Sequence, residues 1–444
     1  MANPDPEVAT DLHERPVDLL RELIRFETVN PPGDERACIE WIGDVLAAYD
    51  VPTETYARDP DRPNILARVP GGDAPPLLLY GHVDVVPVTD QAWTHDPFAA
   101  VVADGHVWGR GALDMKSGVA MLLATVLRYA VAGDEPAGDL LFLAVADEEA
   151  GGDDGLSFLV DEHPELFEDV EYAIGEFGGF SFDFGGVETY PIQVNEKQVC
   201  WLRATFRGNS GHASLPTPDT AVGKLGRFLA ALDEARLPVR ITRPVEASIE
   251  AIADAVADPA AEAAFRGLLD PERTDTILDE LGDAGRMFDA LLHNTANATI
   301  VAGGDKENVV PEAVTCTLDC RLVPGQEPDD VIAELRAATG AEDVEFEVLR
   351  FDPGPPEADL GYFDALAAVL EEATDGVAVP FVMFGATDGR HLARVDVQSY
   401  GFLPMRLGDL PFLELAHSGD ERIPVDTLEW GTQRLVEAVD RYDG

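Results

Sequence analysis

Acidic and imidazole side chains stand at the ends of apolar segments at five widely separated points of the chain. The segments are LLLYGHVDVVPV with His82 and Asp84, GRGALDMKSG with Asp114, DLLFLAVADEEAGG with Glu148 and Glu149, VEYAIGEFGG with Glu176, and LELAHSGDERIP with His417. In an open α/β sheet, the carboxyl ends of the strands gather at one edge, where ligands bind. Imidazole and carboxylate groups without cysteine suit Zn²⁺ or a similar divalent ion in a hydrolytic site. The pattern therefore predicts one convergent metal site.

The elements that would position these groups alternate between strand and helix over residues 1–195. Strands are predicted in NILARV, PPLLLYGHVDVV, DLLFLAVAD and VEYAIGE, and helices in PVDLLRELIRFETV, CIEWIGDVLAAY and GVAMLLATVLRYAV. Such alternation is typical of an α/β sheet covered by helices. At 444 residues the chain is too long for one ordinary core, so we expect two domains.

The pattern changes after residue 195. Strands are predicted in QVCWLRATFRG, AVTCTLDCRLVPG and VEFEVLRF, with helices in TAVGKLGRFLAALDEARL and PDDVIAELRAATG and further helices around 244–295. This order indicates a small α+β module of antiparallel character. The α/β pattern of the first 195 residues resumes after FDPGPPE, and the chain ends with the helix TLEWGTQRLVEAVDRY. We therefore predict one discontinuous domain, residues 1–195 and 354–444, interrupted by an inserted domain, residues 196–353.

The charge balance excludes some partners. The chain has 84 acidic and 31 basic residues, a formal net charge of −53. Nucleic acid and anionic membrane surfaces would repel such a protein, so we expect neither as a partner.

Cysteine usage and hydropathy indicate a soluble protein of the cytoplasm. Cys38, Cys200, Cys316 and Cys320 show no CxxC spacing, which fits a reducing compartment. The first sixteen residues, MANPDPEVATDLHERP, contain no apolar core of a signal peptide, and no stretch is long and apolar enough to span a membrane.

Seven motifs in a fixed order carry a resemblance to a known family. They are GHVDVVP, GRGALDMKSG, ADEEAGG, IGEF, RGNSGHAS, NVVPEAVTCTLDCRLVPG and AHSGDERIP, and the similarity begins at RELIRFETVNPPGDE. This set resembles the M20 metallopeptidases, which include acetylornithine deacetylases, succinyl-diaminopimelate desuccinylases, aminoacylases and glutamate-type carboxypeptidases. The resemblance implies a zinc-peptidase (phosphorylase/hydrolase-like) α/β catalytic domain with an inserted, ferredoxin-like α+β lid or dimerisation domain.

The resemblance also implies a ligand set for two divalent ions per subunit, with zinc expected and cobalt or manganese as alternatives. Asp114 would bridge the ions, because a carboxylate can hold two metals about 3.5–4 Å apart. The peptide after Asp114 is expected to be cis. The remaining ligands would be His82 and Glu176 on one ion, and Glu149 and His417 on the other.

The other site residues are expected to act on substrate or to support the ligands. Asp84 is expected on the same strand face as His82, where it would orient a ligand. Adjacent residues of an extended backbone point opposite ways, so one glutamate of the pair would face the metal and the other the bound water. By resemblance Glu148 is the general base.

Residues of the inserted domain are expected to contact the substrate. By resemblance His212 stabilises the oxyanion, often from the partner subunit of a homodimer. Asn308 and Arg321 of this domain, and Arg390 of the catalytic domain, are candidates for substrate binding. A guanidinium binds a carboxylate through two hydrogen bonds, so the two arginines are candidates for the substrate carboxylate.

Together these features predict a dinuclear zinc amidohydrolase that cleaves an N-acyl or peptide amide bond next to a free carboxylate. The alternatives are a dipeptidase or aminopeptidase of the same family and a non-catalytic metal-binding member. Ala386 stands where desuccinylases commonly have threonine, which disfavours a succinyl-diaminopimelate substrate. The sequence does not specify the acyl group or the amino acid.

The scattered acidic surface, with lysine only at 116, 197, 224 and 306, resembles that of proteins from salt-accumulating halophiles. We predict that the melting temperature rises as potassium chloride is added, because the Debye length falls from about 10 Å at 0.1 M to about 3 Å at 1 M and the carboxylates repel each other less. Circular dichroism across a salt titration measures this. A melting temperature that stays flat or rises on dilution would contradict the halophilic interpretation.

Overall fold

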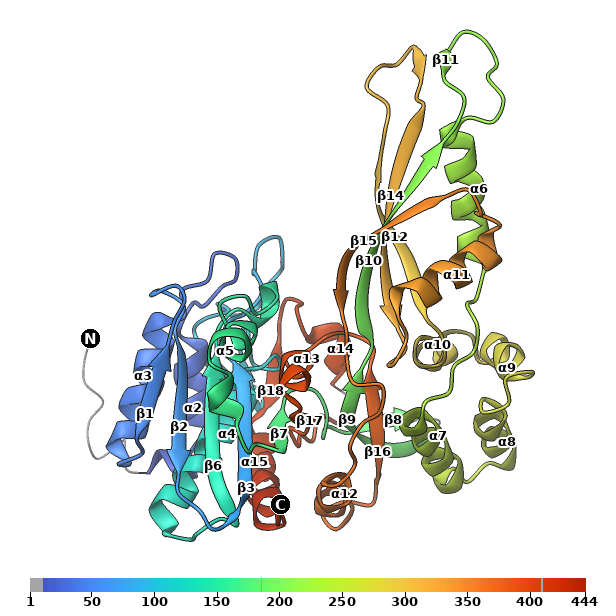
Figure 1. Cartoon of the computed structure of the whole chain (residues 1–444). Helices are drawn as coiled ribbons and strands as arrows, with labels where there is room; N and C mark the ends of the chain where they lie inside the picture. The colour runs from blue at the N-terminus through green and yellow to red at the C-terminus, as the bar shows by residue number, and fades with distance from the viewer. Residues whose placement is uncertain (1–10, 185, 409) are drawn as a thin grey trace. The chain divides into compact units, whose positions relative to one another are not determined.

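The computed structural model describes residues 11–184, 186–408 and 410–444 (Figure 1). The chain forms two compact units, described separately below. Unit 1 comprises residues 1–194, 359–380 and 387–444, and unit 2 comprises residues 195–358 and 381–386. The insert predicted at 196–353 lies within unit 2, and the first ten residues of the N-terminal segment that we interpreted above lie outside the described residues.

Unit 1 is built on a nine-stranded mixed sheet in the order β1-β2-β6-β3-β7-β17-β9-β16, with β8 paired to β9. Its strands are β1 (Thr53–Tyr56), β2 (Asn64–Val69), β3 (Ala74–His82), β6 (Gly138–Val145), β7 (Tyr172–Gly175), β8 (Phe182–Phe184), β9 (Val187–Glu196), β16 (Val377–Met383) and β17 (Gln398–Gly401). The central strands β6, β3, β7 and β17 are parallel, whereas β1, β2 and β9 pair antiparallel to their neighbours. The carboxyl ends of the central strands therefore share one edge.

Helices cover both faces of this sheet. They are α2 (Pro16–Ile24), α3 (Arg36–Ala48), α4 (Lys116–Ala132), α5 (Leu156–Glu162), α12 (Phe363–Glu371), α13 (Gly389–Leu392), α14 (Phe412–Leu415) and α15 (Val425–Asp440), with 3₁₀ helices η1 (Leu12–Glu14), η2 (Glu148–Ala150), η3 (Pro164–Phe167) and η5 (Ala393–Val395). Helix α4 is buried along nearly its whole length, because α2 and α15 pack on the side away from β3. On the opposite face, Leu156 and Leu159 of α5 pack with Leu143 and Tyr80 of the sheet. This is the helix-covered parallel core that the apolar runs predicted.

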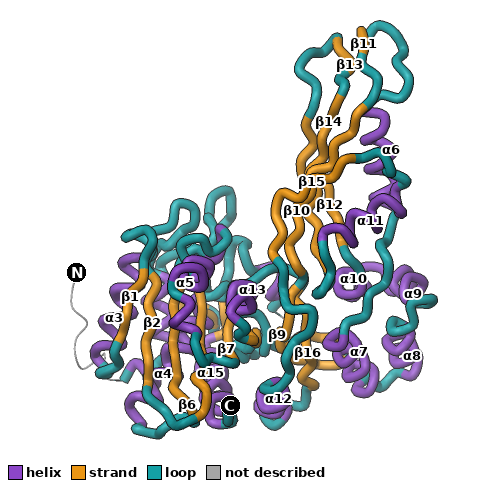
Figure 2. Tube along the Cα trace, viewed as in Figure 1, coloured by secondary structure: helices purple, strands orange, loops and turns teal. Residues whose placement is uncertain are grey.

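Unit 2 contains a four-stranded antiparallel sheet in the order β12-β14-β10-β15. Its elements in chain order are β10 (Gln198–Arg207), α6 (Ala221–Glu234), β12 (Thr295–Ala302), β14 (Ala313–Leu322), α11 (Pro328–Thr339) and β15 (Glu345–Asp352) (Figure 2). This is a ferredoxin-like βαββαβ arrangement. Its core is formed by alternate residues of β10 and β14 under α6 and α11, including Cys316 and Cys320 on one face of β14.

The predicted extra helices of unit 2 lie between α6 and β12. They are α7 (Arg243–Ala255), α8 (Pro259–Gly267), α9 (Thr274–Leu281), η4 (Gly282–Gly285) and α10 (Arg286–Leu292). Two small sheets complete the fold: β11 (Gly211–His212) with β13 (Val309–Val310) in unit 2, and β4 (Val101–Ala103), β5 (His106–Trp108) and β18 (Arg422–Pro424) in unit 1. None of the described helices is long and apolar enough to cross a membrane.

Two local predictions were wrong. Strand β3 ends at His82, so Asp84 lies beyond the strand and not on its face. Glu148 and Glu149 begin the 3₁₀ helix η2 after Asp147, whose φ is +68°, and are not extended. In both places the chain leaves the sheet earlier than the apolar pattern indicated, and the carboxylate of Asp84 binds the backbone N–H groups of Glu148 and Glu149 there.

Candidate metal centre

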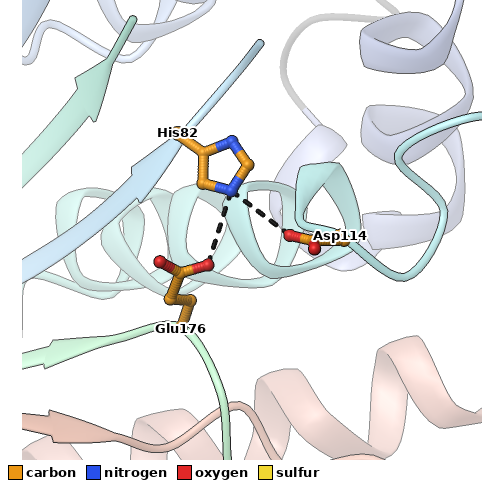
Figure 3. Close-up of side chains that lie close together, drawn as sticks. All are labelled: His82, Asp114 and Glu176. Atoms are coloured by element: carbon orange, nitrogen blue, oxygen red, sulfur yellow. Dashed lines mark hydrogen bonds and ion pairs between the residues drawn. The ribbon is translucent and has the colours of Figure 1, made fainter. Parts of the chain in front are cut away.

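His82 stands at the carboxyl end of the central strand β3 and is almost completely buried. Its Nδ1 lies 3.0 Å from the backbone carbonyl oxygen of Asp84. Because a carbonyl only accepts, Nδ1 donates to it, and Nε2 faces the opposite way, where it is available as a ligand atom in the neutral ring. There Nε2 lies 3.3 Å from Oδ1 of Asp114 and 3.4 Å from Oε2 of Glu176 (Figure 3). The imidazole is thus held in the orientation and tautomer of a metal ligand.

A second group of ligand atoms shares Asp114 with the first. Nε2 of His417 lies 3.0 Å from Oδ2 of Asp114 and 3.3 Å from Oε1 of Glu149. The two groups, His82–Asp114–Glu176 and Asp114–Glu149–His417, each hold three potential ligand atoms close together. Asp114 therefore presents one oxygen to each group, as expected of a bridging carboxylate.

The distances between these atoms fit divalent metal coordination. A tetrahedral ion about 2.0–2.1 Å from its ligands would place those ligands about 3.3–3.4 Å apart. The imidazole–carboxylate pairs in both groups are separated by 3.0–3.4 Å, and all ligand atoms of a group lie within 4.8 Å of one another. Oε1 of Glu149 is buried and faces Nε2 of His417, and a cation placed between them would compensate the charge of this carboxylate.

The electrostatics of the site also favour a cation. Hydrogen bonding to Asp114 and Glu149 raises the pKa of His417 to about 10. For His82, burial lowers the pKa, but Asp114, Asp84 and Glu176 together raise it well above its usual value. Negative charge strong enough to favour protonated imidazoles stabilises divalent ions in the same place.

Asp84 acts on the loop that carries the two adjacent glutamates. Its carboxylate accepts hydrogen bonds from the backbone N–H groups of Glu148 and Glu149 at 3.2 and 3.1 Å, and from Nδ2 of Asn30 at 2.8 Å. Burial opposes the charge of this carboxylate, but the hydrogen bonds from His82 and Asn30 prevail and lower its pKa. Asp84 thus contacts the backbone of the candidate ligand Glu149 from outside the strand, and its predicted role in orienting a ligand stays a prediction.

Glu148 and Glu149 face different neighbours although they are not extended. Glu149 approaches His417, whereas Oε1 of Glu148 lies 3.6 Å from Nη1 of Arg390. Burial, together with the charge of Glu176, raises the pKa of Glu148 well above its usual value. A raised pKa favours the protonated form of the carboxyl group, and a general base must both accept a proton and donate it.

Arg390, in α13, is buried beside the metal ligands. Its Nη1 donates to the carbonyl of Thr387 at 2.7 Å, and its Nη2 to that of Gly151 at 3.4 Å. These contacts tie Arg390 to the loop that follows Glu148. Its predicted binding of a substrate carboxylate stays a prediction.

The other three predicted residues belong to unit 2. His212 and Asn308 lie side by side, because His212 pairs with Val309 between β11 and β13 and Asn308 accepts a hydrogen bond from Ala213 N–H. Nδ1 of His212 accepts from Ser214 N–H at 3.2 Å, so its Nε2 carries the proton in the neutral ring. Arg321 is engaged by Asp319 of the same strand through two hydrogen bonds of 2.8 and 3.2 Å.

Several supporting residues were missed by the sequence analysis. Arg62 donates to Glu35 at 2.8 Å and to Asp147 at 2.7 Å, and Asn30 donates to Asp147 at 3.0 Å. Glu421 binds the backbone around Asp114. Asp147, Asn30 and Glu421 stand within or beside the quoted motifs, so their positions next to ligands were the available signal. Glu35 and Arg62 are buried charged residues that pair across the fold, which no local pattern reveals.

The peptide bond between Asp114 and Met115 is cis, as predicted. Gly111, in the same loop, has φ +84°, and a Cβ there would lie 3.0 Å from side-chain carbons of Lys116 and Val85. The loop that presents Asp114 therefore requires glycine at this position.

Comparison with known proteins gives a family match that includes all of these ligands. The family model described as Peptidase family M20/M25/M40 matches residues 78–441. Aminoacylase-1 of Mus musculus is 26% identical over 100% of this chain and 96% of its own length. A probable carboxypeptidase S-like 2 of Dictyostelium discoideum is 27% identical over 79% of this chain and 68% of its own length.

Solved structures share the fold. An M20 family metallo-carboxypeptidase, Sso-CP2 from Sulfolobus solfataricus, superposes with a TM-score of 0.67 at 17% identity, covering 97% of this chain and 99% of its own. The dipeptidase Dug1p of Saccharomyces cerevisiae superposes with a TM-score of 0.64 at 16% identity, covering 100% of this chain and 99% of its own.

The shared carboxylate generates a prediction about metal content. Asp114→Ala should lose both ions, because it removes a ligand atom from each group, whereas His417→Ala should lose one. Metal analysis after gel filtration measures the stoichiometry. If Asp114→Ala retained one tightly bound ion, Asp114 would not be the bridging ligand.

Proposed function

The chain belongs to peptidase family M20/M25/M40 and is therefore a metal-dependent hydrolase of amide or peptide bonds, and from this premise we propose a more specific activity. We propose that it binds two divalent ions per subunit, zinc in the native enzyme, and hydrolyses an N-acyl amino acid or a peptide at the amide next to a free carboxylate. The observation that carries this proposal is the pair of ligand groups that share Asp114, with Glu148 buried beside them.

The proposed chemistry assigns a step to each side chain. Two bound divalent ions supply a water molecule whose pKa is lowered toward neutrality, together with polarisation of the scissile carbonyl. Glu148 accepts a proton from the attacking water and donates it to the nitrogen of the departing amine. Its raised pKa supports both halves of this role. Arg390 lies close enough to stabilise the carboxylate form of Glu148 before the first transfer and after the second.

His212 is proposed to hydrogen-bond the carbonyl oxygen of the substrate. Its Nδ1 is occupied by Ser214, which leaves the Nε2–H group as the donor. A donor aimed at the developing oxyanion stabilises the transition state more than the ground state. Asn308, beside it, is proposed to contact the same substrate, and Arg321 would take the substrate carboxylate in place of Asp319.

The substrate class is proposed from the relatives that align along most of the chain. Aminoacylase-1 and the N-fatty-acyl-amino acid synthase/hydrolase PM20D1 of Homo sapiens, 26% identical over 83% of this chain, are both named for acyl amino acids. We therefore propose that the substrate is an N-acyl amino acid in preference to a dipeptide. The dipeptidase alternative would need a group that holds a free amine.

Assembly and location are proposed on separate grounds. Strand β12 lies at an edge of the unit 2 sheet, and its Ile300 and Val301 are 61% and 58% exposed. An exposed apolar edge favours strand pairing with a second copy, so we propose a homodimer. The four unpaired, buried cysteines support a reducing location such as the cytoplasm.

A substrate panel tests the proposed activity. N-acetyl, N-succinyl and longer-chain N-acyl amino acids and free dipeptides are assayed in molar potassium chloride with added Zn²⁺, Co²⁺ or Mn²⁺. Turnover of N-acyl amino acids and not of dipeptides supports the proposal. Turnover of dipeptides alone would replace it by the dipeptidase alternative.

Removal of the general base provides the sharper test. Glu148→Ala should keep both ions and lose several orders of magnitude in kcat, because it removes proton transfer and not a ligand. The exposed Glu168 provides a control, and Glu168→Ala should leave kcat unchanged. A Glu148→Ala variant that kept more than about a tenth of the wild-type rate would exclude the assigned role.

Mixed dimers test whether His212 serves the neighbouring subunit. If it acts across a dimer, mixing inactive His212→Ala with inactive Glu148→Ala chains should restore part of the activity, because one site then has both residues. Co-expressed chains with different affinity tags provide verified mixed dimers. Absence of recovery in such dimers would place His212 in the same chain as its metal ligands.

A further inference from the structure

Glu421 joins the two loops that carry Asp114 and His417. Its Oε1 accepts hydrogen bonds from the backbone N–H groups of Leu113 and Asp114 at 2.6 and 3.1 Å. Its Oε2 accepts from Gly111 N–H at 3.1 Å and from the guanidinium of Arg110. Glu421 is completely buried and lies four residues after His417, so one carboxylate fixes the backbone of one ligand and the chain next to the other.

The contact continues from Arg110 back to His417. Nη2 of Arg110 donates to Oε1 of Gln91 at 2.6 Å, and Nε2 of Gln91 donates to the carbonyl oxygen of His417 at 2.8 Å. Glu421, Arg110 and Gln91 thus form a closed set of contacts around the two loops, which we term the Glu421 clamp. Gly419 allows the close approach, because a Cβ there would lie 2.2 Å from the carbonyl oxygen of Ala92.

The two imidazole ligands differ in what fixes them. His82 ends a central strand, is 1% exposed, and is fixed through its Nδ1. His417 lies outside any strand or helix, has φ +65°, and its side chain is 51% exposed. A non-glycine residue in this backbone conformation persists only where its surroundings hold it. For His417, the surroundings include the Glu421 clamp.

The same device occurs at the first ligand group. Asp84 lies two residues after His82 and accepts hydrogen bonds from the backbone N–H groups of the consecutive residues Glu148 and Glu149. Glu421 lies four residues after His417 and accepts the N–H groups of Leu113 and Asp114, also consecutive. Each imidazole is therefore followed by a buried carboxylate that fixes the backbone of a ligand from a distant loop.

We propose that Glu421 is the positioning residue of the second metal, the one held by Asp114, Glu149 and His417, and that it sets the affinity of this ion separately from that of the ion at His82. The inference rests on the proposed two-metal function. His82 lies at the end of β3 and Glu176 directly after β7, so Glu421 does not position these two ligands. The first ion therefore depends on Glu421 only through Asp114. The second ion depends on it through both Asp114 and His417.

The test is titration of the metal-free protein with Co²⁺, followed by calorimetry and by the visible absorption of bound Co²⁺. Wild type should bind two ions and His417→Ala one, which identifies the signal of each. Glu421→Gln cannot accept from Arg110 and Gly111 as a carboxylate does, so it should weaken the second ion by about 10–100-fold, the usual effect of removing a group that orients ligands. The first ion should change little.

The activity of the same variant separates positioning from damage to the fold. At low Co²⁺ the kcat of Glu421→Gln should fall, at saturating Co²⁺ it should recover, and KM should remain that of wild type. The matched control is Glu334→Gln in unit 2, which disrupts another buried glutamate that binds an arginine, Arg240, and an amide, Asn294. It should bind both ions as wild type does, whatever its stability.

If Glu421→Gln does not fold, a second variant still tests the proposal. Gln91→Ala removes the partly exposed end of the clamp and should weaken the second ion in the same direction by a smaller factor. Equal affinities for the second ion in Glu421→Gln and Glu334→Gln, or equal losses at both ions, would overturn the inference. A wild-type protein that bound fewer than two ions would overturn the proposed function instead.

Discussion

Negative charge gathered in a small buried volume is the constraint on which unit 1 depends. Asp84, Asp114, Glu148, Glu149 and Glu176 meet at the carboxyl edge of the central strands. Two like charges about 4 Å apart repel by about 4 kcal/mol at an effective dielectric constant of 20, so five cannot remain ionised without compensation. The protein supplies two imidazoles, Arg390 and backbone N–H groups, and two divalent ions would supply the rest. The need to compensate this buried negative charge explains why loops from both ends of the chain contribute to the site.

The surrounding buried charges are arranged to hold this cluster and not only to neutralise it. Arg62 binds Glu35 and Asp147, and Asn30 joins Asp147 to Asp84. Breaking one partner of a buried pair leaves an uncompensated charge, so such networks hold their members in one arrangement. Two carboxylates therefore fix the turn that presents Glu148 and Glu149. Asp84 accepts hydrogen bonds from its backbone, and Asp147, held by Arg62 and Asn30, directly precedes it.

The sequence predicted the elements whose packing is local and periodic. The strand NILARV coincides with β2, and the predicted helices around residues 118–131 and 328–340 correspond to α4 and α11. The antiparallel strands β9 and β12 were not recognised. Pro191 interrupts the β9 pattern, and β12 is exposed along most of its length, so it lacks the apolar alternation of a half-buried strand.

For the site, the candidate metal ligands could be selected because each ends an apolar segment. The structure brings together His82, Asp114, Glu149, Glu176 and His417 in two groups of ligand atoms. The supporting contacts could not be predicted, since Asp84 and Glu421 act through backbone atoms of loops far away in the sequence. Which main-chain groups a carboxylate meets is a property of the folded loops and leaves no trace in residue type or spacing.

The position of His417 in the chain has a consequence for how the protein matures during translation. All candidate ligands of the His82 group, and Glu149 as well, are present once residue 176 has been synthesised, whereas His417 follows about 240 residues later, after the whole of unit 2. At about 5–20 residues per second the ribosome needs tens of seconds for this stretch. During that interval the nascent chain can complete only one ligand group. The order of residues in the chain therefore makes the His82 group the first of the two whose side chains have all been synthesised.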